Sequence, residues 1–150
     1  MRKITALVFI LFSVLNLKAQ TAEDSVKMTI NRFFEGMKKS DTLLLKSTMM
    51  EGIIFQTIAP NKEGETVVKS ENVAAFLTSI ATPRKDVADE RILFETIKID
   101  GSLASVWTPY KFYMGSQFSH CGANSFQLVR QNGSWKIQYI IDTRRKNGCD

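Results

Sequence analysis

The dipeptide Asn132-Gly133 lies between two segments in which apolar and polar residues alternate, and it is the feature that most constrains the fold. Asn-Gly tolerates the positive φ angles of a tight β-turn, so it indicates a hairpin of two antiparallel strands. A two-residue turn pairs Leu128 with Ile137 and Phe126 with Tyr139 on an apolar face. The alternate residues are mostly polar, so one face of the hairpin is expected to cover a core.

Two further turn signals extend this hairpin into a sheet. Asp100-Gly101 and Gly115-Ser116 each follow a segment rich in β-branched and aromatic residues. The sequence therefore predicts a four-stranded antiparallel meander over residues 91–144. Extending the register of the last hairpin through the second turn places Trp107 and His120 on the apolar face, whereas a shift of one residue moves them to the other face.

The segments before the meander predict elements that cover it. Apolar residues recur at helical spacing in three places, and two short β-rich runs precede the third. The expected helices are 21–39, a short helix capped by Ser40-Asp41, and 71–81 capped by Ser70, and the expected strands are 53–59 and 66–69. Helices on one face of a strongly bent antiparallel sheet give an α+β roll.

Residues 1–19 have the pattern of a signal peptide. Arg2 and Lys3 precede an apolar run of about 14 residues, which is shorter than the roughly 20 that span a membrane. Cleavage is expected after Ala19, which leaves one domain over residues 20–150. Because Gln20 and not Cys follows the cut, no lipid anchor is expected, and the mature chain is predicted to be periplasmic or secreted.

The charge of the mature chain is small. The full sequence carries a formal charge of +5, but removal of the signal peptide leaves 17 Lys and Arg against 15 Asp and Glu, a net +2. A nucleic-acid partner is therefore not expected. The sequence has no glycine-rich phosphate loop, HExxH or CxxC motif, so neither a cofactor nor a metal is predicted.

Cys121 and Cys149 are the two cysteines of the chain. Outside the cytoplasm they can form a disulfide, which would fasten the C-terminal tail to the sheet. The alternative is two unpaired thiols. Neither arrangement has the spacing of a metal site.

The order of elements, the segment INRFFEGMKKSD and the segment SFQLVRQNGSWKIQYII together resemble the nuclear transport factor 2-like superfamily, whose members are also called SnoaL-like or cystatin-like cone folds. With the signal peptide, the FFEG…KSDTLLLKS run looks like its small secreted bacterial group named for lumazine binding. The resemblance covers about residues 21–145. It implies an apolar pocket between helices and sheet, and a homodimer through the outer sheet face.

The resemblance also allows a test for catalysis. The steroid-isomerase branch uses a Tyr on the first helix and an Asp on the first strand, and ungapped alignment puts these at Phe33 and Thr57. Phe cannot donate a hydrogen bond and Thr cannot serve as a carboxylate base, so that route is not expected here. Glu51 and Asp142 are isolated carboxylates in the sequence, so no acid and base pair is predicted.

His120 is the only histidine, and it is either a general base within the cone or a strand-edge residue bonded to a neighbour. Asn124 either binds a polar group of a ligand or satisfies a buried amide. The predicted ligand pocket is lined by Phe33, Met37, Phe55, Thr57, Phe76, Trp107, His120, Asn124, Phe126 and Tyr139.

Two clusters allow a functional and a structural interpretation. An aromatic group in one strand either stacks a planar ligand or packs in a core or interface, with alternate members facing opposite ways: Trp107 and Tyr113, or Tyr110 and Phe112. The basic run 144–146 is either a solvated strand end or an anion site.

Three functions fit these observations. The first is a secreted or periplasmic protein that binds a small apolar or planar molecule without catalysis, because an apolar pocket with few titratable groups suits binding. The second is a weak lyase or isomerase with His120 as its base. The third is a homodimeric interaction module that uses the outer sheet face.

Overall fold

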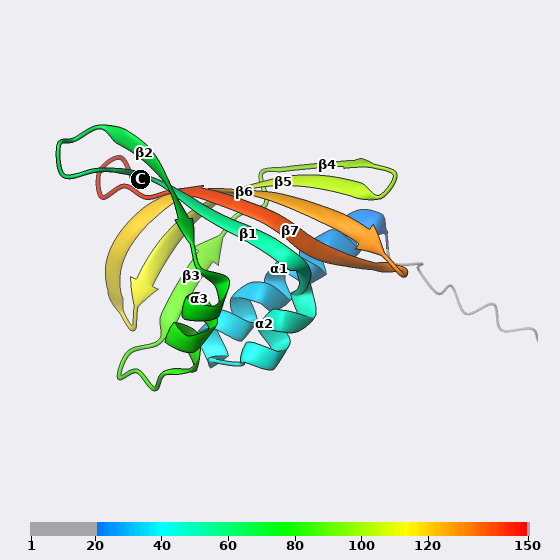
Figure 1. The fold of residues 1–150 in the computed structure, drawn as a ribbon, viewed down its shortest axis with the longest axis horizontal. Helices are drawn as coiled ribbons and strands as arrows, with labels where there is room; N and C mark the ends of the chain where they lie inside the picture. Colours follow the sequence, from blue (N-terminus) through cyan, green and yellow to red (C-terminus); the bar gives the residue numbers. More distant parts are fainter. Residues whose placement is uncertain (1–20, 150) are drawn as a thin grey trace, which may run out of the picture.

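The computed structural model describes residues 21–149, so the expected signal peptide, residues 1–19, and its cleavage site after Ala19 lie outside the described part. Three helices and seven strands follow one another along the chain (Figure 1). They are α1 Ala22–Lys39, α2 Thr42–Thr48, β1 Met49–Pro60, β2 Thr66–Glu71, α3 Val73–Ala81, β3 Ala88–Ile92, β4 Thr96–Asp100, β5 Leu103–Met114, β6 Gln117–Gln131 and β7 Ser134–Thr143.

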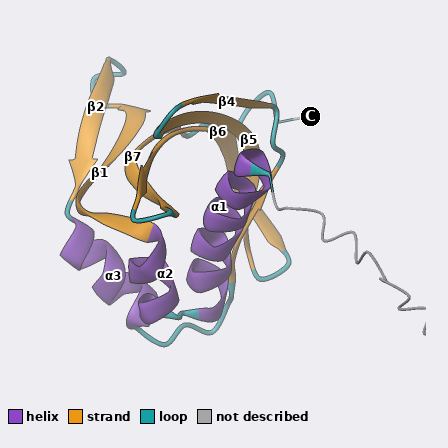
Figure 2. Cartoon of the chain, turned by 90° about the vertical axis from the view of Figure 1, so that its right-hand side faces the viewer, coloured by secondary structure: helices purple, strands orange, loops and turns teal. Residues whose placement is uncertain are grey.

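The strands form one sheet in the order β2-β1-β7-β6-β5-β3, and β4 also pairs with β5. The sheet bends strongly and wraps over the helices, which lie on its concave side (Figure 2). This confirms the predicted α+β class and the placement of the helices. The sheet is mixed and not purely antiparallel, because β1 runs parallel to β7. That pairing covers an edge of β7 that would otherwise be exposed.

The segment expected to be one strand, 91–99, is divided in two. β3 pairs with the second half of β5 and β4 with its first half. Between them the amides of Leu93 and Glu95 still donate to β5 carbonyls, those of Pro109 and Trp107 (2.9 and 3.2 Å). The division lets the sheet edge follow the bend of β5 without losing these hydrogen bonds.

At the start of each helix, a side chain accepts a hydrogen bond from a backbone amide of the first turn. Thr21 and Asp24 form a reciprocal capping box at α1, and Asp41 caps α2 as the sequence predicts. For α3 the predicted cap, Ser70, is wrong. Ser70 remains in β2 opposite Gln56, and Asn72 caps the helix by accepting from the amide of Ala75 (2.9 Å).

The core lies between α1 and the concave face of the sheet. Val26, Ile30 and Phe33 of α1 are buried in one hydrophobic cluster with Phe126 and Leu128. Phe33 contacts a ring from each neighbouring element at centroid distances of 6.1–6.5 Å, those of Phe55, Phe76 and Phe126. Among residues 21–149, no helix has the length and apolar character needed to cross a membrane.

A β-bulge in β7 changes the register of the last hairpin. Leu128 pairs with Ile137 as predicted, but Gln127 then pairs with Tyr139, so Gln138 is an extra residue. Phe126 consequently faces Ile140, and the prediction that it faces Tyr139 is wrong.

A second bulge, in β6, affects the predicted position of Trp107. Tyr113 pairs with Phe118 and Phe112 with His120, which leaves Ser119 as the extra residue. Trp107 therefore pairs with Ser125 on the outer face, where 44% of its surface is exposed. Its predicted place on the apolar face is wrong, because a bulge shifts the pairing that a simple two-residue turn implies.

Candidate ligand-binding site

A cavity of ≈80 Å³ lies between the helices and the concave face of the sheet. Aromatic and aliphatic side chains form most of its wall. They come from α1, α3 and three central strands: Phe33, Phe34, Met37, Phe55, Phe76, Phe126 and Ile140. A surface of this composition favours an apolar ligand or apolar part of one.

A row of polar residues crosses the concave face on one side of this cavity. The register places Thr108 opposite Asn124, Asn124 opposite Asp142, and Asp142 opposite Thr57. Paired residues share a face of the sheet, so four successive strands present polar groups in line. With Glu90, Tyr110 and Arg144 these four form what we call the polar belt.

Asp142 is the most connected member of the polar belt. Its side chain is buried, and one carboxylate oxygen accepts from Thr57 Oγ1 at 2.5 Å. The other oxygen lies 3.1 Å from Tyr110 Oη and 3.0 Å from Arg144 Nε. Charge-assisted bonds of this kind let the sheet hold a buried carboxylate.

Tyr110 and Arg144 complete the charge balance around Asp142. Burial, and next the charges of Asp142 and Glu90, raise the pKa of Tyr110, so its hydroxyl stays protonated and can also donate to the carbonyl of Thr143 (2.9 Å). Arg144 reaches from Asp142 to Glu71 of β2, 3.1 Å away. The guanidinium thus connects both carboxylates at the cavity wall.

Glu90 is the member of the polar belt whose pKa is shifted to near neutral pH. It is half-buried, lines the cavity and accepts a hydrogen bond from Asn124 Nδ2 at 2.8 Å. Burial raises the pKa of Glu90 to about 7, which the hydrogen bond from Asn124 opposes and the charge of Asp142 reinforces. Both protonation states are therefore populated near neutral pH.

Seven of the ten residues predicted to line the pocket do line the cavity, and three do not. Those at the cavity are Phe33, Met37, Phe55, Thr57, Phe76, Asn124 and Phe126. Trp107 and Tyr139 point to the outer face because of the two bulges, and Tyr139 donates to Gln56 Oε1 at 2.6 Å. The polar belt fixes Asn124, which bonds Glu90 and Thr108.

His120 lies on the concave face but does not line the cavity. Its ring stacks on Phe112 at a centroid distance of 4.9 Å and meets Tyr110 edge-on at 5.8 Å. Its Nδ1 is 3.0 Å from Ser119 Oγ. Burial, and next the charge of Arg144, lower the pKa of His120, so the ring is neutral at neutral pH. His120 therefore lies outside the cavity that seven of the predicted pocket residues line.

The sequence did not reveal the pairing of Glu90 with Asp142. No acid and base pair was predicted from the sequence, and the fold brings both carboxyl groups to one cavity. Glu90 precedes the meander predicted over residues 91–144, whereas in the structure it belongs to β3 and pairs with Phe112. Alternation of Ala88, Glu90 and Ile92 along a strand was the available signal.

Cys121 and Cys149 form a disulfide, with 5.7 Å between their Cα atoms. The bond lies outside the cavity and fastens the C-terminal segment to β6. Among residues 21–149, no group of three or more His, Cys, Asp or Glu side chains is placed to hold a metal ion.

No known family model matches the sequence, and no curated protein is similar to it in sequence. Solved structures do match its fold. A nuclear transport factor 2-like protein of unknown function from Shewanella baltica has a TM-score of 0.62 at 14% identity, covering 83% of this chain and 94% of that one. A protein of unknown function from Mycobacterium tuberculosis has a TM-score of 0.66 at 14% identity, covering 84% and 73%.

A third solved structure carries a suggested activity. It is described as a candidate dehydratase of the nuclear transport factor 2-like family, from Streptomyces avermitilis, and has a TM-score of 0.63 at 14% identity, covering 82% of this chain and 95% of that one. At these identities the likeness shows the fold, which is nuclear transport factor 2-like, also called cystatin-like. The closer likeness to the lumazine-binding group stays a prediction.

Proposed function

We propose that this chain, which has the nuclear transport factor 2-like fold, binds a small and mostly apolar molecule in its cavity. The observation that carries the proposal is the composition of the wall, seven apolar side chains facing one row of polar groups. A cavity of ≈80 Å³ is about half the volume of an apolar cavity of about 150 Å³ that accepts benzene, so it suits a short chain or part of a ring.

The polar belt supports one polar group on that ligand. Glu90 Oε1 accepts from Asn124, and no donor to Oε2 occurs among residues 21–149. The ionised carboxylate can accept a hydrogen bond from a ligand hydroxyl, and the neutral acid can donate one to a carbonyl. A small alcohol, enol or ketone with an apolar body therefore matches both ends of the cavity.

A second candidate function is proton transfer, as in a lyase or isomerase. The pKa of about 7 favours it, because a group that exchanges its proton near neutral pH can act as base and then as acid. In this proposal Glu90, and not His120, removes a proton from the bound molecule and returns it at another atom. Asn124 positions the carboxylate by donating to it, and Asp142, which pairs with Asn124 across the sheet, accepts hydrogen bonds from Tyr110 and Thr57.

Native mass spectrometry of protein purified from its own host tests the binding proposal. We expect a bound molecule on the wild type and on Ile141→Phe, whose side chain lies on the outer face, and none on Ile140→Phe, which fills the cavity. Wild-type protein without any bound molecule, or equal occupancy of the two variants, would contradict the proposal.

Exchange of the bound molecule's carbon-bound hydrogen with deuterium from heavy water tests proton transfer. Exchange that Glu90→Gln abolishes, with binding retained, indicates catalysis. Binding without exchange in the wild type rejects the second function and leaves the first.

We propose further that the protein acts in the periplasm or outside the cell, and as a homodimer. The signal-peptide pattern of residues 1–19 and the disulfide support the location. The homodimer is supported by apolar residues exposed on the outer sheet face, including Ile54, Leu103 and Trp107. Immunoblotting of fractionated host cells tests the location, and an intact 150-residue chain in the cytoplasm would contradict it.

A further inference from the structure

A second hollow, of ≈310 Å³, opens on the outer face of the sheet, and we call it the outer hollow. None of the residues that line it lines the cavity. Its sides come from β3, β5, β6 and the C-terminal segment that follows β7. Its size reaches the range of small-molecule sites, about 300–1,000 Å³.

The register places three cations in one line across the outer hollow. Arg91 pairs with Lys111, Lys111 with Cys121, and Cys121 with Arg145. Directly paired residues share a face, and neighbouring strands lie about 4.8 Å apart. The side chains of Arg91, Lys111 and Arg145 are all exposed there.

Within residues 21–149, one of these three cations forms an ion pair and two do not. Lys111 and Arg145 have no ion pair among residues 21–149. Arg91 pairs with Asp89 at 2.9 Å, but Asp89 also binds Lys38 at 2.8 Å. Like charges directly opposite each other destabilise a sheet, so Arg91 beside Lys111 costs stability that a bound anion would offset.

Apolar groups stand beside the cations. The Arg91 guanidinium lies 4.1 Å from the centre of the Tyr113 ring, and Leu93 is 67% exposed next to Pro109 at the same hollow. A flat guanidinium stacked on a ring extends a flat surface on which a planar group can lie.

The disulfide forms the remaining side and fixes Arg145. Cys149 is bonded to Cys121, and Arg145 Nη1 donates to the carbonyl of Gly148 at 2.6 Å. The backbones of Cys121 and Arg145 exchange two further hydrogen bonds, 2.9 and 3.0 Å. The guanidinium is therefore held in place before any ligand arrives, which reduces the entropy lost on binding.

We propose that the outer hollow is a binding site for a small organic anion with a flat apolar part, of the aromatic carboxylate class. The carboxylate lies between Lys111 and Arg145, and the ring lies against Tyr113, Arg91 and Leu93. The site is separate from the cavity and does not depend on the function proposed for it.

Isothermal titration of the wild type with 1-naphthoate tests the site, with neutral 1-naphthalenemethanol as the matched probe. We expect 1-naphthoate to bind and the neutral probe to bind at least about tenfold more weakly, since a charge-assisted contact contributes that much. Lys111→Gln and Arg145→Gln should each weaken 1-naphthoate about tenfold. Added salt should weaken it as well.

Two control variants show whether 1-naphthoate binds at the outer hollow or elsewhere on the protein. Lys98→Gln removes an exposed lysine from the same sheet face, where Lys98 pairs with Ser105, and should leave the affinity unchanged. Ile140→Phe fills the cavity and should also leave it unchanged. Absence of binding to the wild type, equal binding of both probes, or loss in Ile140→Phe but not in Lys111→Gln would overturn the proposal.

Discussion

Glu90 is the residue through which the cavity responds to pH. Its carboxyl group ionises near pH 4.5 in the unfolded chain and at about 7 in the folded protein. Between these values the folded state binds more protons, so the free energy of unfolding decreases as the pH rises through this interval. This decrease in the free energy of unfolding is complete above pH 7 and absent below pH 4.5.

Glu90→Gln should therefore stabilise the protein at about pH 8, by on the order of 3 kcal/mol, and leave it unchanged at about pH 4. The Gln amide oxygen can still accept a hydrogen bond from Asn124, so Gln reproduces this contact of the neutral Glu90 side chain. Urea unfolding at both pH values measures the difference. Glu51→Gln, on an exposed residue, is the control, and an effect of Glu90→Gln that does not vary with pH would contradict the assignment.

Gly122 is required by a close approach of two strands beside the polar belt. A Cβ atom there would lie 1.8 Å from the carbonyl oxygen of Thr143 and 2.8 Å from the Tyr110 ring. Backbone cannot move aside as a flexible side chain can. Gly122→Ala should reduce the free energy of unfolding by about 3 kcal/mol or more.

Gly133→Ala provides the comparison for that experiment. Gly133 has a positive φ of 79°, but a Cβ atom added there would have no neighbour within 4 Å, so only conformational strain of about 1 kcal/mol is expected. Thermal or urea unfolding of both variants measures the contrast. Equal losses would mean that crowding at Gly122 is relieved by a small shift of the strand.

At the level of elements, the sequence predicted most helices and strands but not the register of the sheet. Turn signals and helical spacing are local, so they located the last hairpin and the cap at Asp41. The two bulges, at Ser119 and Gln138, are not local. They accompany the strong bend of the sheet over its helices, and either face of an aromatic strand looks apolar in sequence. Trp107 and Tyr139 were misplaced for this reason.

The C-terminal segment depends on its disulfide. The bond joins residues 28 apart in the sequence. Closing a loop of that size lowers the entropy of the unfolded chain and raises the free energy of unfolding by about 3.5 kcal/mol. Cys121→Ser with Cys149→Ser should lower the free energy of unfolding by that amount, measured by urea unfolding. Cys149→Ser alone should lower it equally, because one substitution already breaks the bond. A double variant much less stable than the single one would show that packing, and not the crosslink, dominates.

At the level of the whole molecule, the pairing of β1 with β7 could not be predicted from the sequence. The two strands are parallel, far apart in the chain and without a shared turn, so no local signal marks their pairing. This pairing brings Thr57 to Asp142 and Phe55 to the cavity, and it thereby completes the polar belt. Hence the apolar wall was largely foreseen, whereas the acid pair was not.

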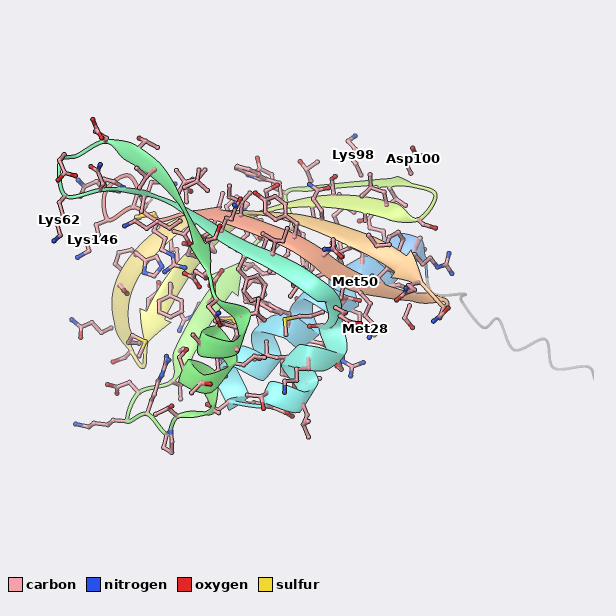
Figure 3. All side chains as sticks on the ribbon, in the orientation of Figure 1. Met28, Met50, Lys62, Lys98, Asp100 and Lys146 are labelled. Atoms are coloured by element: carbon pink, nitrogen blue, oxygen red, sulfur yellow. A yellow bond between two sulfur atoms is a disulfide. The ribbon has the colours of Figure 1, made fainter. Side chains whose placement is uncertain are left out.

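In the proposed homodimer, a second copy of the chain covers the outer sheet face. Figure 3 shows two charged residues of this face, Lys98 and Asp100, on the β4–β5 hairpin, pointing away from the helices. The cations of the outer hollow lie on β3, β5 and the C-terminal segment. Between the edges lie Ile54, Leu103 and Trp107, each nearly half exposed. Aromatic enrichment with depletion of charge is typical of interface centres.

Trp107→Glu should therefore convert the proposed dimer into a monomer, because an unpaired carboxylate would be buried at the centre of a symmetric contact and meet its own copy. The expected mass in analytical ultracentrifugation falls by half, while the melting temperature of the dilute protein changes little, since Trp107 is outside the core. Leu43→Glu, on exposed α2 at the opposite side of the sheet, should leave the dimer intact. A wild-type chain that sediments as a monomer at all concentrations would contradict the homodimer. A dimer that Leu43→Glu dissociates and Trp107→Glu does not would show that the contact lies elsewhere than on this face.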